Sequence, residues 1–294
     1  MTVINTNVAA SITANALTKN ERAMHQAMER LSTGQRINSA GDDAAGLAIS
    51  SRMTSQINGL NMAVRNANDA ISMVQTADGA LAEVEAMLQR MRELAVQAAS
   101  GTMSSTDQAA LNTEFNALTA GIDAVADNTQ WNGTNILDAS SNSGAFTFHV
   151  GANASQTVAV TIRDFTTDGG STSVFENLDD TTTTDFEDDN FDLDAIEISS
   201  ASEAGDALTE VTHAITRLQA ERATLGSVIN RLEYAADNLA NVSQNTSASR
   251  SRVLDADYAS ETTELARTQI IQQAATAMLS QANQQAQSVL ALLK

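Results

Sequence analysis

Hydrophobic residues recur every seven positions between about residues 44 and 100, which predicts a long packed helix. One line of these positions holds Met53, Leu60, Ala67, Val74, Leu81, Leu88 and Ala95. A second line, formed by Ile57, Val64 and Ile71, makes the apolar steps alternate between four and three. Such alternation places apolar side chains on one stripe of a helix, as in coiled coils. The pattern therefore predicts a helix that packs along a partner helix.

Two further segments show helical patterns, and each starts at a polar capping signal. Ser105 followed by Gln108 predicts the start of one helix, and Ser200 followed by Glu203 predicts the start of another. The later segment again repeats apolar residues every seven positions, at Val211, Leu218, Leu225, Leu232 and Leu239. Three long helices, two of them with heptads, predict a mainly α fold built as an elongated bundle of coiled-coil helices.

A short region between the helical blocks alternates apolar and polar residues in steps of two. The alternation covers residues 146–150 and 156–162, with Gly151-Ala-Asn-Ala between them. This pattern is typical of two strands joined by a turn. We expect a small β-hairpin capping the bundle.

The two ends of the chain are uncharged, since residues 1–18 and 268–293 contain no Asp, Glu, Lys or Arg. Their apolar stripes are too thin and too rich in alanine to hold an isolated helix in water. We therefore expect the ends to form helices that pair with each other and pack on neighbouring copies of the chain. Flexible tails are the alternative, although such tails are usually charged or rich in proline. The expected assembly residues are Ile4, Val8, Ile12, Leu17, Ile270, Ala274, Met278, Ala282 and Leu290.

Composition and charge exclude several classes of function. The chain has 36 acidic and 16 basic residues and a formal net charge of −20, which argues against a nucleic-acid partner. It has no cysteine for disulfides, thiol chemistry or metal binding, and no proline to break long helices. No run of about 18 apolar residues occurs, so no membrane-spanning helix is expected. The first residues also lack the pattern of an ordinary signal peptide.

Twelve of the acidic residues lie in residues 164–199, which contain no basic residue. This composition predicts a solvated acidic surface insertion. Its run from Asp185 to Asp194 could attract calcium, but it lacks the central glycine and terminal glutamate of an EF-hand loop. The three histidines form no H-E-x-x-H motif, and no phosphate loop or nucleophile elbow occurs. We expect no enzyme activity, no cofactor and no metal.

These patterns divide the chain into four parts. Residues 1–43 are expected to pair with residues 253–294. Residues 44–163, completed by 200–252, are expected to form the helical bundle and hairpin. Residues 164–199 are the acidic insertion.

Motifs near both ends resemble those of bacterial flagellins. The run from Leu31 to Ile49, LSTGQRINSAGDDAAGLAI, is similar to the N-terminal signature of that family. Residues 251–262 and 272–283 are similar to the C-terminal signature, and 130–133 and 150–153 resemble inner motifs. The resemblance extends over most of the chain outside the acidic insertion.

The resemblance implies an extracellular structural subunit that polymerises into the flagellar filament for swimming motility. Members of this family are exported unfolded through the flagellar type III apparatus with an export chaperone. They add beneath a cap protein, on a filament that starts at the hook–filament junction proteins. The terminal segments, 1–43 and 253–294, would then form the paired helices of the filament core.

Residues 89–97 resemble the patch that the animal innate-immune receptor for flagellin reads. By this resemblance the contacts are Gln89, Arg90, Leu94 and Glu114. Packing between subunits of a protofilament would by itself explain these residues. We therefore expect an assembly surface first and a receptor contact second.

Three alternatives differ from a filament subunit in features of the sequence. A hook–filament junction protein would match the family's ends more loosely and lack the run at 89–97. A subunit with a metallopeptidase insertion would need an H-E-x-x-H motif, and residues 164–199 contain no histidine. A coiled-coil adhesin would not require two uncharged ends.

Overall fold

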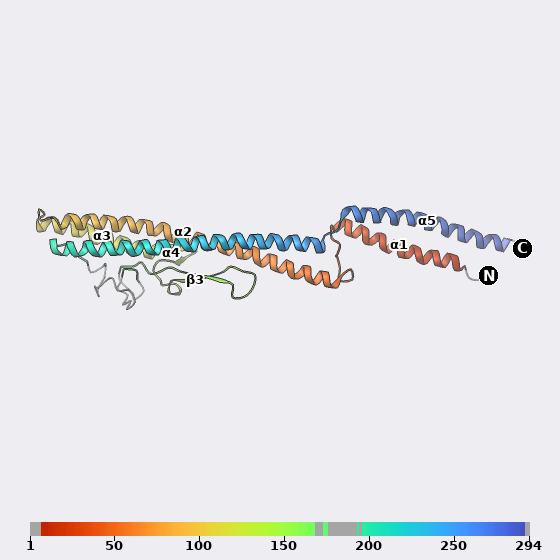
Figure 1. Ribbon diagram of the computed structural model, residues 1–294, viewed down its shortest axis with the longest axis horizontal. Coiled ribbons are helices and arrows are strands. Elements are labelled where there is room, and N and C mark those ends of the chain that lie inside the picture. The colour runs from red at the N-terminus through yellow and green to blue at the C-terminus, as the bar shows by residue number, and fades with distance from the viewer. Residues whose placement is uncertain (1–6, 168–172, 176–192, 194–195, 292–294) are drawn as a thin grey trace. The chain divides into compact units, whose positions relative to one another are not determined.

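The computed structural model describes residues 7–167, 173–175, 193 and 196–291 (Figure 1). These residues form two compact units, one from the ends of the chain up to Ile57 and from Gln244, the other from Asn58–Ser243. The helices are α1 (Val8–Thr33), α2 (Ala44–Ala98), α3 (Ser105–Asn128), α4 (Ala201–Leu254) and α5 (Tyr258–Ala291). The described part of the chain is thus mainly helical, which confirms the predicted fold class.

The predicted heptad stripes form the core of the Asn58–Ser243 unit, where α2, α3 and α4 lie side by side (Figure 1). Leu81 and Leu88 of α2 and Leu218 of α4 are fully buried. Polar side chains align α2 and α4 along this core. Arg222 pairs with Asp78 at 2.8 Å and also with Glu85. The stripes therefore mark the core as predicted.

Capping residues fix where two of these helices begin. Ser104 Oγ accepts the Asp107 amide at 3.3 Å, and the Ser104 amide donates to the Asp107 carboxylate at 3.1 Å. The box predicted at Ser105 is therefore wrong by one residue. Gln108, its expected partner, instead donates to the Ala98 carbonyl at 3.1 Å. At the start of α4, Ser200 Oγ accepts the amide of Glu203 at 3.3 Å, as predicted.

The predicted hairpin is present as β3 (Ala145–His149) and β4 (Thr157–Thr161), which pair antiparallel. Its position differs from the prediction, because it lies along the sides of the helices and not over an end. Asn66, inside α2, donates to the His149 carbonyl at 2.9 Å. Arg231, inside α4, donates to the Ala159 carbonyl at 3.2 Å. Apolar side chains on one face of the hairpin, Val160 among them, complete the core there.

A smaller hairpin joins β1 (Gln130–Trp131) to β2 (Thr134–Asn135), and a 3-10 turn covers Asn142–Gly144. Asn132 and Gly133 connect the two strands with φ of 50° and 76°. Asn-Gly is the favoured pair for a two-residue turn with positive φ. The Asn-Gly dipeptide alone indicates this hairpin. Its two-residue strands are too short to show an alternating pattern, so the sequence analysis did not predict it.

The acidic insertion was predicted to be solvated, and its two ends contradict that prediction. Phe165, Phe175 and Leu193 are buried in the core. The two phenylalanine rings meet edge to face, with 6.1 Å between their centroids. The run from Asp185 to Asp194 lies outside the described residues except for Leu193. The prediction used the overall acidic composition of the segment and did not consider these few large apolar residues, which pack in the core.

Polar side chains of α3 hold both ends of this segment. Asp123 accepts the amide of Thr167 at 2.6 Å and its hydroxyl at 2.7 Å. Asn112 Oδ1 accepts the amide of Ile198 at 2.9 Å. The chain therefore leaves and rejoins the core at two anchored points.

Replacing Gly79 by alanine should raise the free energy of unfolding by about 0.5–1 kcal/mol. Gly79 lies inside α2, and a Cβ there would meet no atom within 4 Å. Gly144→Ala is the matched control with the opposite sign, because Gly144 has φ of +71° and its Cβ would collide with the Ile162 carbonyl. Denaturant unfolding of both variants checks the prediction, and a stabilised Gly144→Ala would contradict it.

Candidate subunit-contact surface

Helices α1 and α5 pack along each other in antiparallel fashion (Figure 1). Asn7 donates to the Ala282 carbonyl at 3.1 Å, and Asn20 donates to the Thr268 carbonyl at 2.7 Å. The less exposed residues recur in steps of three and four on both helices, as in a coiled-coil seam. On α1 the seam residues are Ala10, Thr13, Leu17, Asn20, Met24, Ala27 and Leu31. On α5 they are Glu261, Leu265, Thr268, Gln272, Ala275, Leu279 and Ala282.

The structure divides the predicted assembly residues into two groups. Leu17 and Ala282 are half-buried in the seam and serve contacts within the chain. The others face outward, where Val8 is 54% exposed, Ile12 63%, Ile270 66% and Met278 60%. Ala274 is exposed as well. Ile4 and the side chain of Leu290 lie outside the described residues.

The outward group forms an unusual surface for a pair of helices. Helices of a coiled coil normally carry charged residues outside the seam. Here residues 7–18 and 268–291 carry none, and Val8, Ile12, Ile270, Ile271 and Met278 stand exposed. We call this group the outer stripe. Covering such side chains removes apolar area from water at about 25 cal/mol per Å², so the outer stripe favours contact with another surface.

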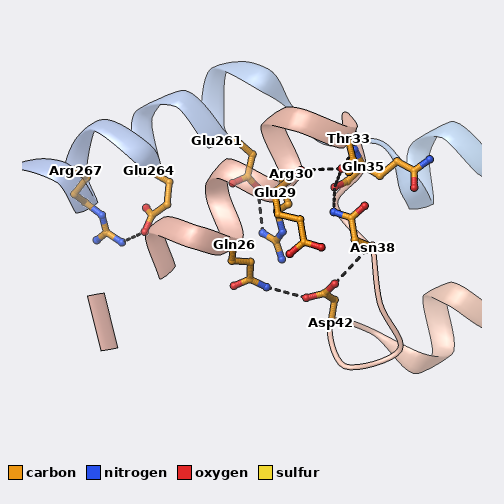
Figure 2. Close-up of polar contacts among 10 residues, drawn as sticks. All are labelled: Gln26, Glu29, Arg30, Thr33, Gln35, Asn38, Asp42, Glu261, Glu264 and Arg267. Carbon is orange, nitrogen blue, oxygen red and sulfur yellow. Dashed lines mark hydrogen bonds and ion pairs between the residues drawn. The ribbon is translucent and has the colours of Figure 1, made fainter. Parts of the chain in front are cut away.

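A polar loop shapes the chain where α1 ends and α2 begins (Figure 2). Gly34 terminates α1 with φ of 71° and donates its amide to the Arg30 carbonyl at 2.9 Å. Asp42 then holds the loop together, because its carboxylate accepts the amide of Ser39 at 3.0 Å and the side chain of Gln26 at 3.0 Å. These bonds, led by the Ser39 amide, hold the pKa of Asp42 below its ordinary value of 3.8.

The same loop crosses the connection between α4 and α5. The Arg36 amide donates to the Leu254 carbonyl at 2.7 Å, and the Arg36 guanidinium donates to the Val253 carbonyl at 2.8 Å. In return, the Ala256 amide donates to the Gly34 carbonyl at 2.9 Å. The crossing thus satisfies the last carbonyls of α4 and ties the start of α5 to the end of α1.

The second predicted contact patch combines residues from α2 and α3. Gln89, Arg90 and Glu114 are exposed, and Arg90 pairs with Glu114 at 2.8 Å and with Glu93 at 2.9 Å. Leu94 is 0% exposed, so its placement among the surface contacts is wrong. Here α2 packs against both α3 and α4, which makes its buried face wider than a two-helix seam. Val96, 51% exposed on the next turn, is an apolar surface residue that the sequence argument missed.

Comparison with known proteins identifies the family. The family model described as the bacterial flagellin N-terminal helical region matches residues 4–142. The model of the bacterial flagellin C-terminal helical region matches residues 208–293. This chain belongs to the bacterial flagellins. It is 42% identical to the flagellin of Bacillus subtilis, over 99% of both chains.

Further relatives extend the comparison. The flagellin of Halalkalibacterium halodurans is 41% identical, over 99% of this chain and all of the relative. The crystal structure of Bacillus cereus flagellin covers 60% of this chain and 88% of that chain, at 28% identity and a TM-score of 0.47. As a flagellin, the chain is a structural subunit that polymerises with its own copies into the flagellar filament, an extracellular appendage. Nothing in these matches favours a junction protein.

Two other kinds of site are absent from the described residues. No helix in that part of the flagellin combines the length and apolar character needed to cross a membrane. Within the same residues, no cluster of three or more His, Asp or Glu side chains is placed to hold a metal ion.

Replacing Asp42 by asparagine should lower stability at neutral pH and matter less in acid. A carboxyl group with a lowered pKa in the folded state stabilises the fold above its unfolded pKa. That contribution is lost as the pH falls through the folded value, which lies below 3.8. Unfolding midpoints of wild type and Asp42→Asn should therefore differ at pH 7 and converge as the pH falls below 3.8. Glu29→Gln, an equal charge change on the exposed side of α1, is the control. A gap that does not depend on pH would contradict this role of Asp42.

Proposed function

We propose that the outer stripe of α1 and α5 is the surface through which subunits contact one another in the filament core. The observation that supports this is the exposure of Val8, Ile12, Ile270 and Met278 on the uncharged segments of two helices whose seam is already occupied. Neutral amide and alanine neighbours allow many copies to pack closely without repulsion between like charges. The seam itself is composed largely of small and polar side chains. Neighbouring copies then supply burial that the isolated pair lacks.

The limited burial within the isolated pair of helices also explains how premature assembly is avoided. We propose that the terminal segments are unfolded during export and become ordered when the subunit joins the filament. Ordering a backbone costs roughly 1–2 kcal/mol per residue, and contacts with neighbours offset that cost at the growing end. The export chaperone, the cap protein and the hook–filament junction proteins are the partners of these steps. Export through the flagellar apparatus replaces a cleaved signal peptide, and the chain's role is mechanical and not catalytic.

We also propose that Gln89, Arg90 and Glu114 form a contact between subunits of a protofilament, which the innate-immune receptor for flagellin recognises on free subunits. The Arg90–Glu114 pair supports this, because it holds side chains of α2 and α3 in one exposed, charged group. In this proposal Leu94 lies beneath the patch and supports it through the core.

The self-assembly of purified flagellin tests the role of the terminal helices. The intact chain should form long tubes, measured by sedimentation and electron microscopy, and a chain lacking residues 1–30 and 265–294 should stay soluble. The double variant Ile12→Gln and Ile270→Gln keeps both helices and should lose most of its pelletable polymer. Met28→Gln makes the same change at an exposed apolar residue in the charged part of α1, and should polymerise normally. Tubes from the truncated chain would contradict the proposal.

Stability measurements separate the surface residues of the second patch from the buried one. Leu94→Ala should lower the free energy of unfolding by about 2–5 kcal/mol, because it leaves a cavity in the core. Arg90→Ala should change stability little, since both partners of its ion pair are exposed and solvent screens them. Activation of receptor-bearing reporter cells by the Arg90→Ala subunit should nevertheless fall. Unchanged activation would contradict the receptor contact.

A further inference from the structure

An ion pair joins the end of α1 to the start of α5 (Figure 2). Arg30 Nη1 and Glu261 Oε1 lie 3.0 Å apart, and the two side chains are only 25% and 12% exposed. The Nε atom of Arg30 is buried and has no hydrogen-bond partner among the described residues. Water therefore solvates this cation poorly, and it depends on Glu261 for charge compensation.

The rest of the seam contributes little to the register, that is, to the position of α5 along the axis of α1. Residues 7–18 of α1 and 268–291 of α5 carry no charge, so no ion pair between these parts of the two helices can fix their alignment. Asn7 and Asn20 donate to backbone carbonyls, and every residue offers such an acceptor. A displacement of one heptad could form equivalent bonds. In the described part of the chain, Arg30–Glu261 is the ion pair that bridges these two helices.

A displaced register would separate Arg30 from Glu261. Seven residues of helix correspond to about 10 Å of displacement. In one direction Arg30 would move towards Thr268, and α5 has no acidic residue beyond Glu264. In the other direction it would pass Tyr258, the first residue of α5, towards Asp257 and Asp255, which accept hydrogen bonds from the Ala259 amide and the Ser251 hydroxyl. Glu264 likewise pairs with Arg267, so either displacement moves a largely buried cation from its partner to carboxylates that are bonded elsewhere.

The helix ends add to this preference. Arg30 lies in the last turn of α1 and Glu261 in the first turn of α5, where each charge also interacts favourably with its own helix dipole. The crossing of residues 34–36 with residues 253–256 ties the two connections by three hydrogen bonds. Those bonds join residues outside α1 and α5, so they do not by themselves fix which faces of the two helices meet. A charge-specific contact on the helices themselves does so.

We propose that Arg30 and Glu261 are a positioning pair that sets the register of α1 on α5. The pair thereby sets the positions of Ile12 on α1 and Met278 on α5 relative to each other along the helix axes. Both residues belong to the outer stripe that meets a second copy of the chain. This inference rests on the proposed function, because the register matters through contacts between copies.

The register is measurable with a pair of spin labels, because the chain has no cysteine of its own. Ser11→Cys on α1 and Ser280→Cys on α5 place labels at two exposed residues. Labelled subunits are diluted into filaments of the same unlabelled variant, and pulsed electron spin resonance gives the distance distribution. The variants are Glu261→Gln and the exchange Arg30→Glu with Glu261→Arg. Glu264→Gln is the matched control, since Glu264 pairs with Arg267 inside α5.

Wild type and Glu264→Gln should each give one distance and the same amount of polymer. Glu261→Gln should give a second distance displaced by about 10 Å, or a broadened distribution, together with less polymer. The exchange should restore the single distance, although its charges oppose the helix dipoles. An unchanged distance in Glu261→Gln filaments, or an exchange that restores nothing, would overturn the inference. Failure of the wild-type chain to polymerise would instead count against the proposed function.

Discussion

The seam between α1 and α5 is the contact on which the terminal unit depends. Its residues are mostly small or polar, with Ala10, Thr13 and Asn20 on one side and Thr268 and Ala275 on the other. Five larger apolar side chains, Leu17 and Leu265 among them, also lie in the seam, but Val8, Ile12, Ile270 and Met278 stay outside it. The two helices therefore pack together while part of their apolar surface stays exposed to water. Such an imbalance favours contact with a further surface that covers the exposed apolar side chains.

The other unit follows the opposite rule. There the large side chains point inward, and Leu81, Leu88 and Leu218 are fully buried. One flagellin chain therefore contains a well-packed helical core and a terminal pair that leaves several large apolar residues exposed. This division corresponds to the change in composition along the sequence, from charged heptads to uncharged ends.

Regular patterns predicted most of the fold. Heptad spacing located α2 and α4 because burial on one face of a helix must repeat with the helical period. The lack of charge at both ends located the outer stripe. The i, i+4 stripes could not separate Leu17 from Ile12, because the seam and the outward face both contain apolar residues. Only the partner helix decides which of the two residues is covered.

Other failures have equally specific causes. Leu94 resembled a surface contact by motif, but two neighbouring helices bury it. Ser104 and Ser105 are identical side chains, and the carboxylate of Asp107 decides which of them caps α3. The crossing at Gly34, Arg36 and Leu254 consists mainly of backbone bonds between segments far apart in sequence. No local pattern encodes such bonds.

The anchoring of Thr167 and Ile198 on α3 has a consequence for how flagellins diversify. Asp123 and Asn112 define a fixed exit and a fixed return for the chain, and the phenylalanines beside them seal the core. For a segment tethered at both ends, doubling its length adds only about 0.6 kcal/mol of closure entropy. Insertions between the anchors therefore cost the fold little free energy as long as they spare the buried residues 173–175 and 193. A lineage can thereby change the length of this segment while keeping the helical core.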